Sequence, residues 1–231
     1  VGIGLGNISE SQIAQEIMKS WNFAETFISE NDLAVEIYAA ESWNKATDEI
    51  IIDSEVYDVA TKSWLIEDDE TKELRSPTSW EVYERFTDIL SVSEDKRTGF
   101  VRVSIEYLSP KIAKQWLDMY VDAINKHMQA RQVSKVSNNI DYLEEQIKRT
   151  SIAEMREVFY TIIEEQTKNK MVAEASPDYA FVAVSPSMIP EEKSKPKRAL
   201  LCVIGTLFGG AMSAIWILFS HYVRDNKNLR I

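Results

Sequence analysis

The chain offers few of the residue types from which catalytic centres are usually built. Its two histidines, His127 and His221, fall in segments with different predicted structures, a long helix and the end of an apolar stretch. Cys202 is the only cysteine, which excludes an intramolecular disulfide and a multi-cysteine metal site. No serine stands in a nucleophile elbow, and no loop has the glycine spacing of a phosphate-binding motif. We therefore predict no catalytic, cofactor-binding or metal-binding residues.

Carboxylates are the one abundant group with catalytic potential. A glycosidase would need two of them in a concave pocket, and no pattern in the sequence marks such a pocket. The acidic run at residues 67–70 lacks the alternating carboxylates and the bend glycine of a calcium loop. We interpret it as a solvated acidic loop, and we keep a membrane-anchored carbohydrate enzyme only as an alternative.

The charge distribution disfavours a nucleic-acid partner. The 231 residues carry a formal net charge of -11, and residues 25–95 alone hold 20 Asp and Glu against 5 Lys and Arg, a local balance of -15. Binding to phosphates requires charge of the opposite sign. We therefore expect partners other than nucleic acid.

The most distinctive pattern lies near the C-terminal end. Residues 199–223 contain no Asp, Glu, Lys or Arg, and a helix of that length rises about 37 Å, which exceeds a hydrocarbon core of about 30 Å. We therefore expect a transmembrane helix there. Small residues at Gly205, Gly209 and Ser213 give it a smooth face for packing against another membrane helix. A proline-rich basic entry precedes it and consists of Pro186, Pro190, Pro196, Lys197 and Arg198.

The first half of the chain predicts an α+β domain. Residues 9–28 have apolar positions spaced by three and four, which indicates an amphipathic helix with Ser9 or Ser11 as its N-cap. A second helix is predicted from Ser79 to Leu90. Residues 92–107 then predict a β-hairpin that turns at Gly99.

The longest regular element follows this hairpin. Residues 111–176 contain neither Gly nor Pro, and their apolar spacing approaches that of a coiled coil. A capping-box pattern at residues 151–154 predicts a break near Thr150 and a new helix from Ile152. The first helix would be roughly 55 to 60 Å long, which is longer than a compact domain, so we expect it either to project as an arm or to pack along other chains. Its predicted seam residues are Val136, Ile140, Leu143 and Ile147, and His127 is interpreted as a residue of the helix surface or of a contact between helices.

Together these patterns divide the chain into five parts. Residues 179–184 are predicted to form a last strand that returns beside residues 100–107. The chain starts at Val1 without Met or a signal-like stretch, so we interpret it as a fragment of a longer protein. The predicted parts are an α/β base (1–110), a helical arm (111–176), a return strand with a Pro-rich basic linker (177–198), a transmembrane helix (199–223) and a tail (224–231).

Three groups of residues carry a resemblance to a known family. They are SVSEDK at residues 91–96 with VSIE at 103–106, AEMRE at 153–157 with IEEQT at 163–167, and PKRAL at 196–200 with Gly205 and Gly209. In these stretches the chain resembles the Wzz-type chain-length determinants, the polysaccharide co-polymerases of Gram-negative inner membranes. The similarity runs from about Trp80 to Ser213.

The resemblance implies a fold, a location and a role. The implied fold is α+β, with a periplasmic α/β base, a long helical arm and one C-terminal transmembrane helix; the family also has an earlier membrane helix and cytoplasmic termini. The implied role is not enzymatic and uses no cofactor. A ring-like homo-oligomer in the inner membrane sets how many repeat units a Wzy-type polymerase adds to O-antigen or a related lipopolysaccharide, in contact with the polymerase and the polysaccharide.

Two further hypotheses share the long helical arm. One is a co-polymerase for capsule or exopolysaccharide, and the other is a periplasmic adaptor of an export machine. An adaptor would carry lipoyl-like half-motifs beside its helical hairpin, and the sequence has none.

Overall fold

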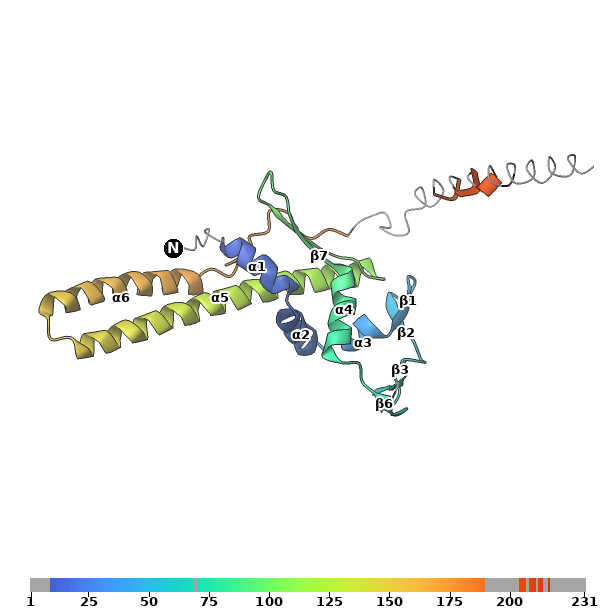
Figure 1. Cartoon of the computed structure of the whole chain (residues 1–231), viewed down its shortest axis with the longest axis horizontal. Helices are drawn as coiled ribbons and strands as arrows, with labels where there is room; N and C mark the ends of the chain where they lie inside the picture. The colour runs from blue at the N-terminus through green and yellow to red at the C-terminus, as the bar shows by residue number, and fades with distance from the viewer. Residues whose placement is uncertain are drawn as a thin grey trace, which may run out of the picture. The chain divides into compact units, whose positions relative to one another are not determined.

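The computed structural model describes residues 9–68 and 70–189 and, further on, residues 204–206, 208–210, 212, 213 and 216 (Figure 1). The chain forms two compact units, Val1–Ile189 and Pro190–Ile231. The first unit contains all the helices and strands that are named below.

The first unit begins with two helices where the sequence pattern predicted one. Helix α1 (Glu10–Lys19) starts with a capping box in which the Ser9 hydroxyl accepts from the Gln12 N–H and the Gln12 side chain accepts from the Ser9 N–H. Ser20 then adopts an extended conformation that ends α1, and its hydroxyl accepts from the Phe23 N–H to cap α2 (Trp21–Glu30). The apolar spacing continues across this break, which is why periodicity alone predicted a single helix.

A short helix and three small hairpins follow. They are α3 (Ala34–Tyr38), β1 (Ala40–Asn44) with β2 (Glu49–Ile52), β3 (Tyr57–Asp58) with β4 (Ser63–Trp64), and β5 (Ile66–Glu67) with β6 (Leu74–Arg75). Each pair is antiparallel and forms its own two-stranded sheet. In the acidic run, Glu67 therefore ends β5, and Asp68 and Glu70 lie in the turn that follows.

The turns of these hairpins share one chemistry. Asn44, Asp58 and Asp68 each accept, through a side-chain oxygen, the N–H of the residue two positions later. Four positions after each of them a residue has positive φ, namely Asp48, Lys62 and Lys72. Asp and Asn favour such turns because their side chains satisfy the backbone of the bend.

Helix α4 (Ser79–Ile89) and the hairpin after it agree closely with the sequence. The cap of α4 is Thr78, one residue before the predicted Ser79, and it forms a capping box with Glu81. Strands β7 (Leu90–Glu94) and β8 (Val101–Ile105) pair in register from Leu90 opposite Ile105 to Glu94 opposite Val101. Gly99 supplies the positive φ of +73° in the turn.

Two long helices complete the unit. Helix α5 (Pro110–Arg149) starts with Pro at its first turn after the Ser109 cap, and α6 (Ala153–Glu174) runs back beside it (Figure 1). The predicted break near Thr150 is confirmed. The predicted capping box is wrong, because Ile152 is the N-cap and no side chain caps the helix.

The core is built where α1, α2 and α4 pack on the first half of α5. Its centre is an aromatic cluster in which the ring centroids of Phe27 and Phe86 lie 4.8 and 5.4 Å from that of Tyr120. Tyr120 is fully buried, and its hydroxyl donates to the carbonyl of Met18. Burial raises the pKa of Tyr120, so this donor keeps its proton and locks α1 to α5.

The predicted return strand is wrong. Residues 179–184 form no strand, and Ala180 and Phe181 lie against α5 rather than beside β8. The physical reason is a buried amide on α5, that of Asn125, which bonds to the backbone of this segment and takes the place of a neighbouring strand.

The predicted transmembrane helix is also corrected. Among the residues that the structure describes, no helix combines the length and the apolar character needed to cross a membrane. Helices α5 and α6 are long enough, but charged residues run along both of them. Within residues 199–223 the described helical positions are 204–206, 208–210, 212, 213 and 216, and the remainder of that prediction lies outside the described residues. The α+β fold with a long helical arm is what the structure retains of the predicted fold class.

Candidate functional site

The second half of α5 and all of α6 form a projecting helical hairpin, which we call the arm (Figure 1). Residues 110–128 of α5 belong to the core, and the arm begins at Gln129. At about 1.5 Å per residue, residues 129–149 extend roughly 30 Å, and the 22 residues of α6 extend about 33 Å. The arm is therefore an elongated element whose sides are largely open.

The four predicted seam residues lie along α5 within this hairpin. Val136 is buried, with 2% of its surface exposed, and Ile140, Leu143 and Ile147 are half-buried. On α6 the half-buried residues Phe159, Ile162 and Ile163 recur at the same kind of spacing. Because α6 is the element that packs along this half of α5, the seam joins two helices of one chain.

The root of the arm is fixed by polar side chains that sequence reasoning missed. Gln129 Nε2 donates to the carbonyls of Ala173 at 2.9 Å and Ser176 at 3.0 Å, where α6 ends. The Ala173 carbonyl also accepts from the Ser176 N–H at 3.2 Å, so the Gln129 amide joins a turn that already closes the end of α6. The sequence signal that could have identified Asn125 and Gln129 was the presence of a polar residue within the apolar stripe of α5.

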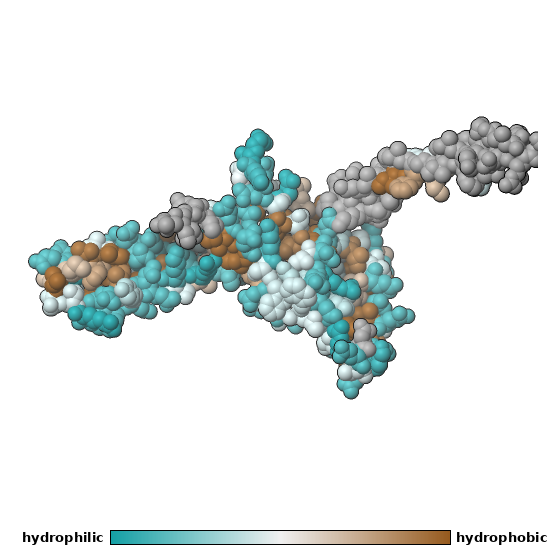
Figure 2. Space-filling view, viewed as in Figure 1, coloured by the Kyte–Doolittle hydropathy of each residue, from teal (hydrophilic) through white to brown (hydrophobic). Residues whose placement is uncertain are grey.

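The outer surface of the arm exposes large apolar side chains. We call this set the arm-tip surface, and Figure 2 shows apolar atoms gathered over the outer part of the arm. Exposed ion pairs lie on the same helices, both near the tip, where Arg149 and Glu145 are 3.2 Å apart, and further along α6, where Lys168 and Glu164 are 2.7 Å apart. Large apolar groups that cluster on a surface mark sites of interaction. The arm-tip surface consists of Tyr142, Ile152, Met155, Val158 and Tyr160, each between 43% and 64% exposed.

The other predicted site residues lie outside this arrangement. Pro186 is exposed on an irregular segment of the first unit. In the second unit, Gly205 and Gly209 are helical, and a Cβ on either would meet no atom within 4 Å. The Ser213 hydroxyl donates to the Gly210 carbonyl at 2.9 Å. Pro190, Pro196, Lys197 and Arg198 are outside the described residues.

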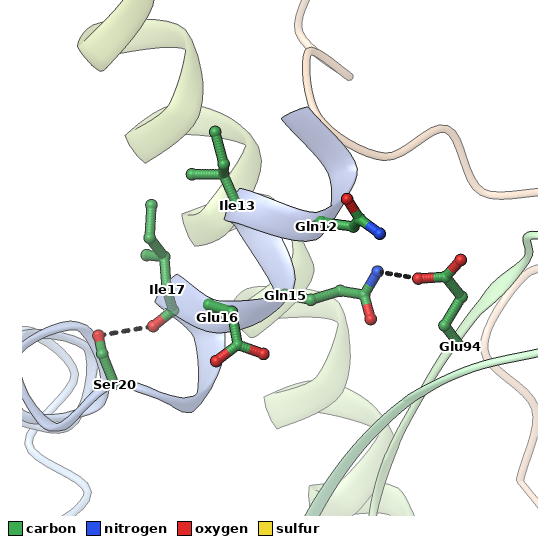
Figure 3. Close-up of a pocket in the computed structure, with 7 residues that line it drawn as sticks. All are labelled: Gln12, Ile13, Gln15, Glu16, Ile17, Ser20 and Glu94. Atoms are coloured by element: carbon green, nitrogen blue, oxygen red, sulfur yellow. Dashed lines mark hydrogen bonds between the residues drawn. The ribbon is translucent and has the colours of Figure 1, made fainter. Parts of the chain in front are cut away.

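A shallow depression of about 650 Å³ lies over α1 beside the end of β7 (Figure 3). Gln15 is 94% buried there, and its Nε2 donates to Glu94 Oε2 at 3.0 Å. Figure 3 shows Gln12 and Gln15 directed toward Glu94, with Glu16 turned away from them. The amide–carboxylate bond fixes the hairpin to α1, and the depression brings no nucleophile to a base.

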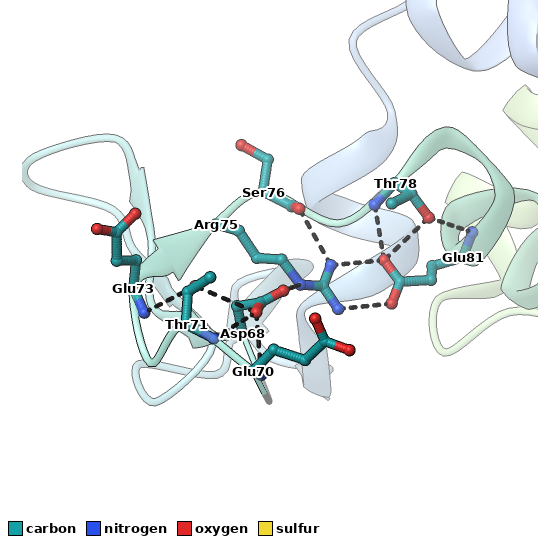
Figure 4. A network of polar contacts seen from close by, with 8 residues as sticks. All are labelled: Asp68, Glu70, Thr71, Glu73, Arg75, Ser76, Thr78 and Glu81. Atoms are coloured by element: carbon teal, nitrogen blue, oxygen red, sulfur yellow. Dashed lines mark hydrogen bonds and ion pairs between the residues drawn. The ribbon is translucent and has the colours of Figure 1, made fainter.

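Asp68, from the acidic run, takes part in a structural network (Figure 4). Arg75 donates to both oxygens of Glu81 at 2.8 Å, and its Nε lies 3.6 Å from Asp68 Oδ2. The bonds from Arg75, followed by that from the Thr78 N–H, lower the pKa of Glu81 to about 2. The network joins the β5–β6 hairpin to the start of α4. Within the described part of the chain, no three metal-ligating side chains gather into a metal site.

Comparison with known proteins does not assign the chain to a family. No protein-family model matches the chain, and no curated protein matches it. The arm and the residues that position it are therefore the basis for a functional proposal.

Proposed function

We propose that this chain regulates polysaccharide chain length as a non-enzymatic scaffold. In this proposal several copies assemble on the periplasmic side of the bacterial inner membrane. They act on a Wzy-type polymerase that builds O-antigen or a related lipopolysaccharide. The observation that carries the proposal is the arm, a long helical hairpin that projects from an α+β base and exposes an apolar surface near its tip.

The resemblance to the Wzz-type family supports the proposal because of the positions that the resembling residues have in the fold. Residues 91–96 and 103–106 occupy β7, the start of its turn and β8, while residues 153–157 and 163–167 both lie on α6. Two of the three resembling groups therefore coincide with the hairpin of the base and with one helix of the arm, and the third, at residues 196–200 with Gly205 and Gly209, belongs to the second unit. A capsule or exopolysaccharide co-polymerase would use the same parts, so the polymer made by the cell decides between the two.

The exposed apolar residues of the arm are suited to a scaffold in which copies of the chain contact one another. Each large apolar side chain removed from water contributes about 1.5 to 3 kcal/mol when it is fully buried. Several such residues on the arm-tip surface would stabilise contacts between copies. The polymerase would form every bond, and the assembled arms would bias when polymerisation stops.

The test is the length distribution of the polysaccharide in cells that make arm-tip variants. We expect Met155→Ser and Val158→Ser to leave the polymer present but to shift or broaden its lengths on a gel. Lys168→Ser, an exposed change on the same helix, is the matched control and should leave the profile unchanged. Glu16→Gln and Glu94→Gln test the alternative of a carbohydrate enzyme. Loss of all polymer in one carboxylate variant, with normal lengths in both arm-tip variants, would contradict the scaffold.

A further inference from the structure

A second exposed feature lies far from the arm tip along the chain, on helix α4 of the base. Trp80 is 54% exposed although tryptophan carries the largest apolar surface of any residue. Trp21, at the start of α2, is 42% exposed. Neither position is needed for the core, whose aromatic centre is formed by other residues. Exposed apolar side chains that lie close together mark candidate sites of interaction.

The indole of Trp80 is held in a fixed orientation. Its Nε1 donates to Glu84 Oε1 at 2.8 Å, one helical turn further along α4. Its ring lies 5.3 Å from that of Tyr83, centroid to centroid, with the planes tilted by 49°. Tyr83 is itself anchored, because its hydroxyl donates to the Lys19 carbonyl at 2.7 Å, just before Trp21. The exposed ring is thus ordered before any ligand arrives.

Glu84 adds hydrogen-bonding capacity at the edge of this ring. An ionised carboxylate has about four acceptor positions, and the Trp80 N–H uses one of them. Glu84 has no cationic partner among the residues that the structure describes. Arg85, the next residue, stacks on the Tyr38 ring at 4.1 Å and donates to the Tyr38 carbonyl. The remaining acceptor positions of Glu84 are available to hydroxyl donors.

We infer that Trp80 and Glu84, supported by Tyr83, form a binding site for a neutral glycan. A pyranose ring offers a flat C–H face that stacks on an indole and hydroxyl groups at its rim that donate to a carboxylate. The local balance of -15 over residues 25–95 opposes an anionic ligand. The choice of a polysaccharide as the ligand rests on the proposed function. The inference adds a contact between the base and this polymer.

The test is a titration of the whole chain, labelled with ¹⁵N in tryptophan, with three neutral hexasaccharides: maltohexaose, cellohexaose and N-acetylated chitohexaose. At least one should shift the Trp80 indole signal at concentrations up to about 10 mM, a range typical of weak binding. Trp80→Ala should weaken binding about tenfold, and Glu84→Gln should weaken it by a smaller factor. Phe100→Ala, which removes an exposed ring on the β7–β8 turn, is the matched control and should leave affinity unchanged.

Four outcomes would overturn the inference. The first three are the absence of binding to all three hexasaccharides, unchanged affinity in Trp80→Ala, and salt-dependent binding of hexalysine alone, which would assign the surface to a basic peptide. Shifts that depend on protein concentration without sugar would likewise assign it to a second copy. None of these outcomes depends on the length profiles of the arm-tip variants, so the glycan site and the scaffold proposal can fail separately.

Discussion

Asn125 and Phe181 are joined through both halves of one side-chain amide. Asn125 Nδ2 donates to the Phe181 carbonyl at 3.0 Å, and Asn125 Oδ1 accepts from the Phe181 N–H at 2.8 Å. The same oxygen accepts from the Ala180 N–H at 2.9 Å. A helix side chain thus makes the bonds that a neighbouring β-strand would make, which holds the segment after the arm against the core.

Replacing Asn125 by Ala should destabilise the fold. The side chain is 2% exposed, and its loss leaves backbone groups of the half-buried residues Ala180 and Phe181 without these partners. A fully buried group without a partner costs about 1 to 3 kcal/mol, so we expect a loss of about 1 kcal/mol, measured by urea unfolding of the whole chain. Asn139→Ala, at an exposed position on the same helix, should change the free energy of unfolding by less than about 0.5 kcal/mol. Equal effects in the two variants would refute the anchoring role.

Adding a methyl group at Gly99 should destabilise the turn, although the methyl group would contact no other atom. Gly99 has φ of +73°, and a Cβ there would meet no atom within 4 Å, so Gly99→Ala isolates the backbone cost. We expect a loss of about 1 kcal/mol, measured by thermal unfolding. Lys72 already holds φ of +59° with its own Cβ, so Lys72→Ala should be close to neutral. A neutral Gly99→Ala variant would show that the turn relaxes to another form.

Acidification should weaken the link between the β5–β6 hairpin and α4. Arg75 and the N–H of Thr78 lower the pKa of Glu81 from an ordinary 4.5 to about 2 in the folded chain. The folded state therefore binds fewer protons than the unfolded state between these values. The stabilisation is fully present above pH 4.5 and is lost as the pH falls toward 2. A carboxyl titration followed by NMR should place the midpoint for Glu81 near 2.

The control for this titration is Arg75→Gln. Without the guanidinium, the pKa of Glu81 should rise toward its ordinary value, although the capping bond from Thr78 keeps part of the shift. The stability of Arg75→Gln should also depend less on pH below 4.5 than that of the original chain. A midpoint that stays near 2 in this variant would assign the shift to the helix cap alone.

The parts of the fold that sequence predicts well are those set by local chemistry. Gly99, Pro110 and the apolar spacing of α5 each act within a few residues, and the elements around them were placed to within one or two positions. The hairpins between residues 40 and 75 were missed because their bends use Asp and Lys where a glycine is the usual signal. Their common signal was an Asn or Asp four residues before each positive φ.

Contacts between segments that are distant in the sequence were also not predicted. Residues 179–184 are apolar enough for a strand, but Asn125 bonds to part of their backbone from 55 positions earlier in the chain. The seam illustrates the same point, since its spacing predicted which side of α5 is apolar without identifying the partner. Within the first unit that partner is α6, which folds back at Thr150.

The arm should open independently of the core when its seam is weakened. Leu143 is half-buried, so Leu143→Ala should cost less than the 2 to 5 kcal/mol of a fully buried leucine, on the order of 1 to 2 kcal/mol. Because the main core cluster ends at Met128, the loss should fall on the arm. Amide hydrogen exchange would show this as faster exchange in α6, with α2 unchanged. Tyr142→Ala, at a neighbouring exposed position, should leave α6 protected. Faster exchange in α2 and α6 together would mean that the arm and base unfold as one unit, and a scaffold role would then require the arm to be rigid rather than separately adjustable.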